Sequence, residues 1–204
     1  MQSSAAEVNA AVIQATEVVP LSAVLLRHEL GRRPMRRPDL EAENATYLLL
    51  ADEFKAGPLR LLQALMDAAV SLCCAGTAGV SLLEDLPDGR KQFRWTVLSG
   101  RLDFAINGTT PREFSPCGVC LDHDAPVLFS NPDHRYTFLQ TAGLPLREAL
   151  ILPFYANGEH AGTIWIVSHD SSGHFDMEDV RIMTRLARFA GDAYAALVVA
   201  SLTS

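Results

Sequence analysis

Two cysteines and a histidine follow one another at three-residue intervals, at Cys117, Cys120 and His123. Two thiolates and an imidazole could supply three ligands of a tetrahedral zinc site. A closed site would need a fourth ligand, and Asp122 or His134 could serve. Because no second cysteine pair accompanies the first, the spacing is a weak metal signal. The sequence therefore assigns no metal.

The same cysteine pair has two further interpretations. Ser115 and Pro116 are typical of a helix start. A helix that begins near Cys117 would direct its dipole at the thiol, lower the thiol pKa and favour thiol–disulfide exchange. Alternatively, the two cysteines pack as small apolar groups beneath a loop. Packing, redox or ligand contact, and metal binding all stay open.

Aromatic and polar residues elsewhere extend the list of candidates. Trp95 and Trp165 fall on expected strands, where each is either core or a flat surface for a planar ligand. His134 and Arg135 follow a turn, either at a pocket mouth or on the surface. No phosphate-binding loop, serine-hydrolase or zinc-peptidase motif occurs, so no catalytic residue is assigned. The candidate ligand-binding residues are Trp95, Phe114, Cys117, Cys120, Asp122, His134 and Trp165.

Composition limits the class of protein. The chain has 204 residues, of which 49% are hydrophobic, enough for one domain with a real core plus an extension. Its formal charge of −7 argues against a general nucleic-acid binder. Four cysteines, two of them adjacent at Cys73 and Cys74, do not make a disulfide scaffold and indicate a reducing compartment. No signal peptide or membrane-spanning run is recognised, so the expected location is cytoplasmic.

A hairpin is the strongest structural signal. Two apolar runs, 149–156 and 161–169, flank Asn157-Gly158, a dipeptide that suits a type I′ turn. Both runs are apolar at nearly every position, which predicts that both faces of the sheet are covered. Pro153 removes one hydrogen-bond donor and predicts a bulge or a locally unpaired position.

The N-terminal third is expected to be helical. Residues 3–30 read as two helices separated near Pro20, the second ending before Gly31. Two arginine pairs then follow, Arg32-Arg33 before Pro34 and Arg36-Arg37 before Pro38. This pattern favours a stiff solvated linker over a basic patch for an acidic partner. Asp39 is expected to cap a helix that ends near Phe54.

The remaining elements complete an α+β pattern. We expect helices at 58–75 and 177–200, the latter capped by Asp176, and strands at 77–84, 92–98 and 126–130. Residues 99–113 read as a loop, and 131–139 as a short helix or turn. The prediction is one antiparallel sheet of about five strands, with the terminal helices on one face and a cover of loop and small helix on the other. The expected units are a helical extension with an Arg/Pro linker at 1–38, a lead-in helix at 39–57 and one α+β domain at 58–204.

This order of elements, with the blocks R-E-A-L-I-L-P-F, A-G-T-I-W-I-V-S-H-D and F-D-M-E-D-V-R-I-M, resembles the GAF domain over roughly residues 58–200. It is most similar to GAF domains of bacterial sensors and histidine kinase input modules. The resemblance implies a PAS-related fold and a non-enzymatic module that senses a small molecule or redox state. It also implies a pocket under residues 100–124, a homodimer formed through the terminal helices, and a signalling partner such as a histidine kinase. The ligand or cofactor stays unknown.

Two other functions stay open. The G-V-C at 118–120 is similar to a loop of free methionine-(R)-sulfoxide reductases, which implies a reactive thiol at Cys120. That family uses three cysteines, whereas this chain has Thr110 at one expected position and no cysteine within 132–142. The third interpretation is a structural dimerisation module whose pocket is filled by its own side chains.

Overall fold

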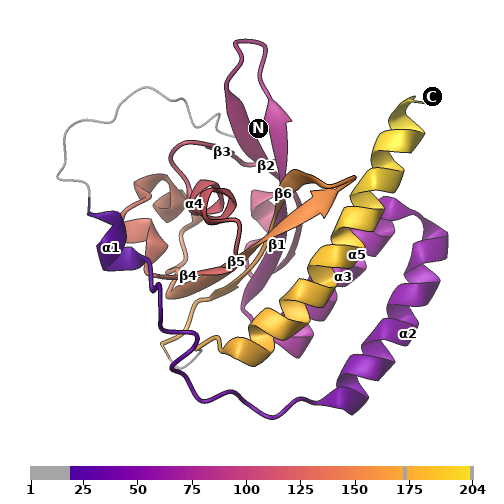
Figure 1. The fold of residues 1–204 in the computed structure, drawn as a ribbon, viewed down its shortest axis with the longest axis horizontal. Helices are drawn as coiled ribbons and strands as arrows, with labels where there is room; N and C mark the ends of the chain where they lie inside the picture. The colour runs from indigo at the N-terminus through magenta and orange to yellow at the C-terminus, as the bar shows by residue number, and fades with distance from the viewer. Residues whose placement is uncertain (1–18, 172–173, 203–204) are drawn as a thin grey trace, which may run out of the picture.

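A computed structural model describes residues 19–171 and 174–202, which are arranged around one six-stranded sheet (Figure 1). The strand order is β3-β2-β1-β6-β5-β4, and all neighbours are antiparallel. The strands are β1 (Thr77–Asp85), β2 (Lys91–Gly100), β3 (Thr109–Pro111), β4 (Val127–Ser130), β5 (Glu148–Ala156) and β6 (Glu159–Ser168). The α+β class is confirmed, but the expected count of five strands is wrong. The extra strand, β3, is three residues long and lies inside the segment predicted as loop, where its pairing with β2 makes it a strand.

The predicted hairpin around Asn157-Gly158 is present, because β5 and β6 pair with each other. Asn157 and Gly158 have φ angles of 53° and 81°, the left-handed conformation that the turn between β5 and β6 requires. Pro153 pairs with Thr163 on β6, but it lies past the last β4 pairing, which joins Val127 to Ile151. That edge of β5 has no strand partner there, so the missing N–H of Pro153 removes no ladder hydrogen bond.

Three helices cover one face of the sheet: α2 (Leu40–Ala56), α3 (Pro58–Leu72) and α5 (Met177–Leu202). The helices α3 and α5 lie on the sheet, and α2 packs on α3. The predicted caps form, because Asp39 accepts a hydrogen bond from the Ala42 amide and Asp176 accepts one from Glu178. Alternate residues of the central strands, such as Ile164 and Ile166, enter the core that these helices bury.

Shorter elements cover the opposite face. They are the helix α4 (Pro116–His123) and the 3₁₀ helices η1 (Asp103–Ala105), η2 (Pro132–His134) and η3 (Thr137–Ala142). A second hydrophobic cluster lies beneath them and includes Phe93, Phe129 and Tyr136. The small helix predicted near Cys117 is therefore present. The cover is more extensive than the predicted 100–124, because η2 and η3 also belong to it.

The segment 19–38, here called the strap, differs from the prediction. The helix expected to run to Leu30 is only α1 (Leu21–Val24), and the first predicted helical piece lies largely outside the described residues. At Leu25 the chain becomes extended and bridges to Phe129, and the Leu26 amide donates to the Leu128 carbonyl at 2.8 Å. Turns follow at 27–32. Pairing with the free edge of β4 overrides the helical propensity of this stretch.

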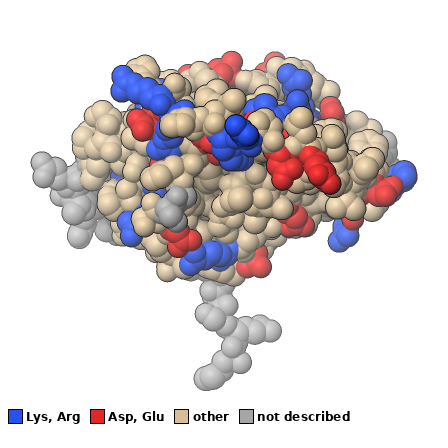
Figure 2. Space-filling view, turned by 90° about the horizontal axis from the view of Figure 1, so that it is seen from below, with Lys and Arg blue, Asp and Glu red and all other residues tan. Residues whose placement is uncertain are grey.

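The arginines of the strap are not all solvated, so the linker interpretation is wrong for two of them. Arg33 makes two hydrogen bonds to the Glu148 carboxylate, at 2.9 and 2.7 Å. Arg36 contacts the carboxylates of Asp176 at 3.3 Å and Asp179 at 2.6 Å. The face seen in Figure 2 likewise has acidic and basic side chains interspersed. The acidic partners of these arginines thus belong to the same chain.

The predicted division into units at 1–38, 39–57 and 58–204 stays a prediction. Within 19–171 and 174–202, none of the helices combines the length and the apolar character that crossing a bilayer requires.

Candidate functional site

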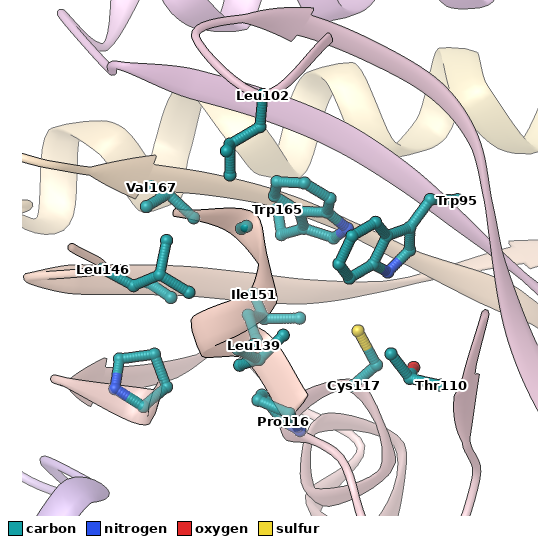
Figure 3. A pocket seen from close by; sticks show the side chains of 13 residues that line it. Trp95, Leu102, Thr110, Pro116, Cys117, Leu139, Leu146, Ile151, Trp165 and Val167 are labelled. Carbon is teal, nitrogen blue, oxygen red and sulfur yellow. The ribbon is translucent and has the colours of Figure 1, made fainter. Parts of the chain in front are cut away.

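A pocket lies between the sheet and the cover, on the face away from the long helices (Figure 3). Its volume is about 50 Å³. Side chains from β2, β3, β5, β6, α4, η2 and η3 meet in it, together with residues from the connections after β2 and before β5. The lining residues are Trp95, Leu102, Thr110, Pro116, Cys117, Pro132, Leu139, Ala142, Leu146, Ala149, Ile151, Trp165 and Val167. All are buried except Trp95 and Ala142, which are partly exposed.

Two tryptophans form one wall of the pocket. The rings of Trp95 on β2 and Trp165 on β6 meet edge to face, with centroids 6.0 Å apart and an interplanar angle of 63°. Two glycines make room for them. A Cβ atom at Gly79 would lie 2.3 Å from the Trp165 ring, and one at Gly108 would lie 2.9 Å from the Trp95 ring. The rings therefore occupy space that any larger residue at these two positions would take away.

A few hydroxyl and thiol groups lie beside the tryptophans. The Trp165 indole N–H donates to the Ser81 hydroxyl at 2.8 Å, and the Cys117 thiol lies 3.7 Å from the same oxygen. The hydroxyl of Thr110 is buried in the pocket wall and has no hydrogen-bond partner among the described residues. An unpartnered buried hydroxyl is costly and uncommon in native structures. This hydroxyl therefore has hydrogen-bonding capacity that the described residues do not use.

Helix α4 presents Cys117 to the pocket and turns Cys120 away from it. Ser115 caps the helix by accepting a hydrogen bond from the Gly118 amide at 3.0 Å, as predicted. The Cys120 thiol instead faces the carbonyl oxygens of Ala125 and Ile151, each at 3.5 Å. Cys117 therefore lines the pocket, whereas Cys120, about one helical turn later, is packed in the protein interior.

The lowering of a thiol pKa that the redox interpretation requires does not occur. Burial raises the pKa of Cys117 and also raises the pKa of Cys120. Loss of water around a thiolate therefore outweighs the favourable dipole of an eight-residue helix. Thiols in this state are poor nucleophiles at neutral pH.

The zinc interpretation finds no geometric support. His123 is exposed at the C-terminal end of α4, whereas both cysteines are buried. Within the described ranges, no group of three or more His, Cys, Asp or Glu side chains could hold a metal ion.

The structure brings together three of the seven candidate ligand-binding residues. Trp95, Cys117 and Trp165 line the pocket. The other four lie outside its lining. The Cys120 thiol points away from the pocket, and exposed Asp122 pairs with Arg112 at 2.7 Å. His134 is exposed on η2, and the Phe114 ring contacts Tyr136 and Arg135. Whether any of the seven contacts a ligand stays a prediction.

Several lining residues were not predicted from the sequence. Thr110 lies on the strand that was read as loop, and Leu139 lies on η3, where the pattern has no clear period. Ile151 and Val167 belong to strands that were predicted, and the period-two alternation around Trp165 could have assigned them to the pocket face.

A larger groove of about 460 Å³ lies on the surface between α5 and the end of β5. Exposed charged residues, Asp124, Arg188 and Asp192, form much of its rim. The two hollows thus differ in chemistry, since the inner pocket has no charged lining residue.

Comparison with known proteins agrees with this architecture. A family model described as GAF domain matches residues 56–195. No curated protein matches the chain.

Solved structures that share the fold come from several kinds of protein. The GAF domain of an Acinetobacter phosphoenolpyruvate-protein phosphotransferase is 11% identical, with a TM-score of 0.63 over 82% of this chain and 99% of that one. The GAF-B domain of DevS from Mycobacterium smegmatis is 20% identical, with a TM-score of 0.57 over 72% and 99%. A free methionine-R-sulfoxide reductase from Neisseria meningitidis is 17% identical, with a TM-score of 0.61 over 82% and 97%. At these identities the likeness establishes the fold alone.

Proposed function

The chain belongs to the GAF domain family, and from this premise we propose that it binds a small organic molecule in the inner pocket and signals its presence. GAF domains are in general sensory or regulatory modules. The finer proposal is a cytoplasmic module of bacterial signal transduction. All four cysteines are free thiols, which supports a reducing compartment.

One observation carries this proposal: a pocket remains where a sheet face and its cover would otherwise be fully packed. Protein interiors are normally filled as densely as organic crystals. Here two tryptophans border open space, and the Thr110 hydroxyl in the same wall lacks a partner. A purely structural module would gain stability by filling the space and bonding the hydroxyl, so its retention favours ligand binding.

The strap offers a route from the pocket to the terminal helices. Arg135, which precedes the cover residue Tyr136, donates a hydrogen bond to the Val19 carbonyl at 2.6 Å. Further along the strap, Arg36 pairs with Asp179 at the start of α5, and the chain then enters α2. We expect a ligand that shifts the cover to bias the strap, and through it α2 and α5. The size of this population shift is limited by the difference in ligand affinity between the two states.

The proposed partner is a second copy of the chain, joined through the terminal helices. Leu48 and Leu49 on α2 are 74% and 69% exposed, and Phe189 on α5 is 40% exposed. Burial of these side chains against a symmetric copy would supply a hydrophobic driving force. A histidine kinase or another signalling protein would then receive the change. Light scattering at several protein concentrations tests the dimer, and a monomer at all of them would contradict it.

Thiol chemistry is less well supported, although a methionine sulfoxide reductase shares the fold. Cys120 has no exposed surface, and its pKa is raised by burial. Redox sensing by Cys117 and Cys120 is less well supported for the same reason, because both thiols are buried and burial raises the pKa of each. Incubation with methionine sulfoxide and a thiol reductant is the test of the reductase alternative, and enzyme-like formation of methionine would establish it.

Native mass spectrometry of freshly purified protein, beside a denatured sample, tests the ligand proposal. We expect extra mass of a small organic molecule that is lost on denaturation. The variant Ala149→Phe, which places a ring in the pocket, should lack this mass while it keeps the wild-type circular dichroism spectrum. Extra mass that persists in a folded Ala149→Phe variant would place the ligand elsewhere and refute the proposal. Should that variant not fold, Ile151→Phe serves the same purpose.

A further inference from the structure

The wall of the inner pocket carries no charge. None of its thirteen lining residues is acidic, basic or histidine. A charged group moved from water into such a site without a partner loses hydration free energy that no group of the site replaces. Phosphates, carboxylates and zwitterions are therefore poor occupants, and this includes free amino acids such as methionine sulfoxide.

The polar groups of the pocket gather at one end. In Figure 3, Thr110, Cys117 and the indole nitrogen of Trp95 lie at one end, and Leu146 and Val167 lie at the other. Thr110 is only 4% exposed, and its hydroxyl is unpartnered within the described chain. The Trp165 nitrogen is already used, because it donates to Ser81. One hydroxyl, with an indole N–H and a thiol beside it, suits a single oxygen atom.

We propose that the pocket selects an uncharged, largely apolar molecule with one hydroxyl or carbonyl oxygen, which Thr110 contacts. This inference rests on the proposed function, since it assumes that the pocket receives a ligand. The apolar body of the ligand lies against Trp95, Trp165 and the aliphatic end, where burial of its surface supplies the affinity. The single oxygen supplies orientation and selectivity.

Size adds a further condition. The pocket volume of about 50 Å³ is smaller than the roughly 150 Å³ cavity that accommodates benzene in a protein core. A ligand with one ring must therefore displace part of the cover. Leu139 and Ala142 lie on η3, and 3₁₀ helices have weaker hydrogen-bond geometry than the α-helices of the opposite face. The same displacement that admits the ligand would move the neighbouring Arg135, which holds the strap.

Three probes of equal ring size separate these requirements: 4-methylphenol, toluene and 4-methylbenzoate. Each is titrated into the isotope-labelled full chain, and amide and indole chemical shifts report affinity and location. We expect 4-methylphenol to bind the pocket about tenfold more tightly than toluene, as one neutral hydrogen bond allows. We expect 4-methylbenzoate to leave pocket signals unchanged, or to shift only signals near Arg188 in the surface groove.

Variants assign the selectivity to one side chain. Thr110→Val should remove the preference for 4-methylphenol over toluene. Thr109→Val, at the neighbouring and partly exposed position of β3, is the matched control and should keep it. Thr110→Ser retains a hydroxyl and should restore most of the preference if Thr110→Val folds poorly.

The outcomes separate the inference from the function on which it rests. Equal affinity for toluene and 4-methylphenol, an unchanged preference in Thr110→Val, or pocket binding of 4-methylbenzoate would overturn the inference and leave a ligand site standing. No pocket shift with any probe, together with no extra mass in the native spectrum, would overturn both.

Discussion

The two faces of the sheet differ in whether their buried polar groups have partners. On the side of the long helices and at the strap, every buried carboxylate of the described residues faces an arginine. These carboxylates are Glu43, Glu148, Asp176, Glu178 and Asp179, and the arginines are Arg33, Arg36, Arg181 and Arg185. On the pocket face there are no charged lining residues, and the Thr110 hydroxyl lacks a partner.

This difference separates stability from binding. Paired charges and filled packing fix the helices to the sheet, since a broken pair would leave a buried charge. The pocket face keeps open space and an unpartnered hydroxyl, features that lower stability in the free protein and are relieved by a ligand. The helix face is thus expected to be rigid, and the cover is expected to respond to ligands.

Core truncation should give the largest contrast between the faces. Leu65 on α3 is fully buried on the helix face, so Leu65→Ala should lower the free energy of unfolding by about 3 kcal/mol. Leu139 on η3 already borders the pocket, so Leu139→Ala should cost less, about 2 kcal/mol. Urea denaturation at one fixed protein concentration measures both values. Equal losses would mean that the two faces are packed alike.

Removal of one strap arginine should lower the free energy of unfolding by nearly as much as Leu65→Ala does. Arg33→Met leaves the Glu148 carboxylate buried without its bidentate partner and should cost about 3 kcal/mol. The double variant Arg33→Met/Glu148→Met should recover much of this loss. Arg32→Met changes an exposed neighbour and should stay within about 0.5 kcal/mol of the wild type. An Arg33→Met variant with the unfolding free energy of the wild type would show that the strap does not stabilise the sheet.

Acid should weaken the contact between α2 and α5 through Glu43. Hydrogen bonds from Arg181 lower the pKa of Glu43 from its ordinary 4.5 to about 2, despite the opposing effect of burial. Because the folded pKa is depressed, this contribution is complete above pH 4.5 and is lost as the pH falls from 4.5 towards 2. The loss should be on the order of 2 kcal/mol.

Denaturation midpoints across this pH window measure the effect of Glu43. In Glu43→Gln the pH dependence should flatten, whereas Glu41→Gln, which changes an exposed residue of the same helix, should follow the wild type. Identical slopes in wild type and Glu43→Gln would contradict this assignment.

Modification of the exposed cysteine thiol should have the smallest effect on stability. Cys74 is exposed, while Cys73, Cys117 and Cys120 are buried. Burial raises the pKa of each of these three thiols. A disulfide reagent at neutral pH should therefore modify one thiol rapidly, and Cys74→Ser should abolish this phase without a change in stability. Rapid modification of Cys117 or Cys120 would instead support thiol chemistry on the pocket face.

The sequence predicted regular elements better than contacts. Local signals sufficed for the Asn157-Gly158 hairpin, the Asp39 and Asp176 caps and the helix at Cys117. The strap was read as a longer helix and a solvated linker because its shape depends on distant partners, the β4 edge and Glu148. No local pattern reveals such partners.

The site was predicted only in part for the same reason. Trp95, Cys117 and Trp165 lie on periodic elements and were found, whereas Thr110 and Leu139 lie on a very short strand and a 3₁₀ helix. The redox interpretation, which required a lowered thiol pKa, lost support because burial, which depends on the whole fold, raises the pKa of both thiols.

A methyl-group NMR titration of the full chain with 4-methylphenol tests the contrast between the faces most directly. The pocket is lined by methyl groups of Leu139, Leu146, Ile151 and Val167, whereas those of Leu65 and Leu186 lie in the helix-face core. We expect saturable shifts of the pocket methyl signals, while the signals of Leu65 and Leu186 stay unchanged. Unchanged pocket methyls, or larger shifts in the helix-face core, would contradict it.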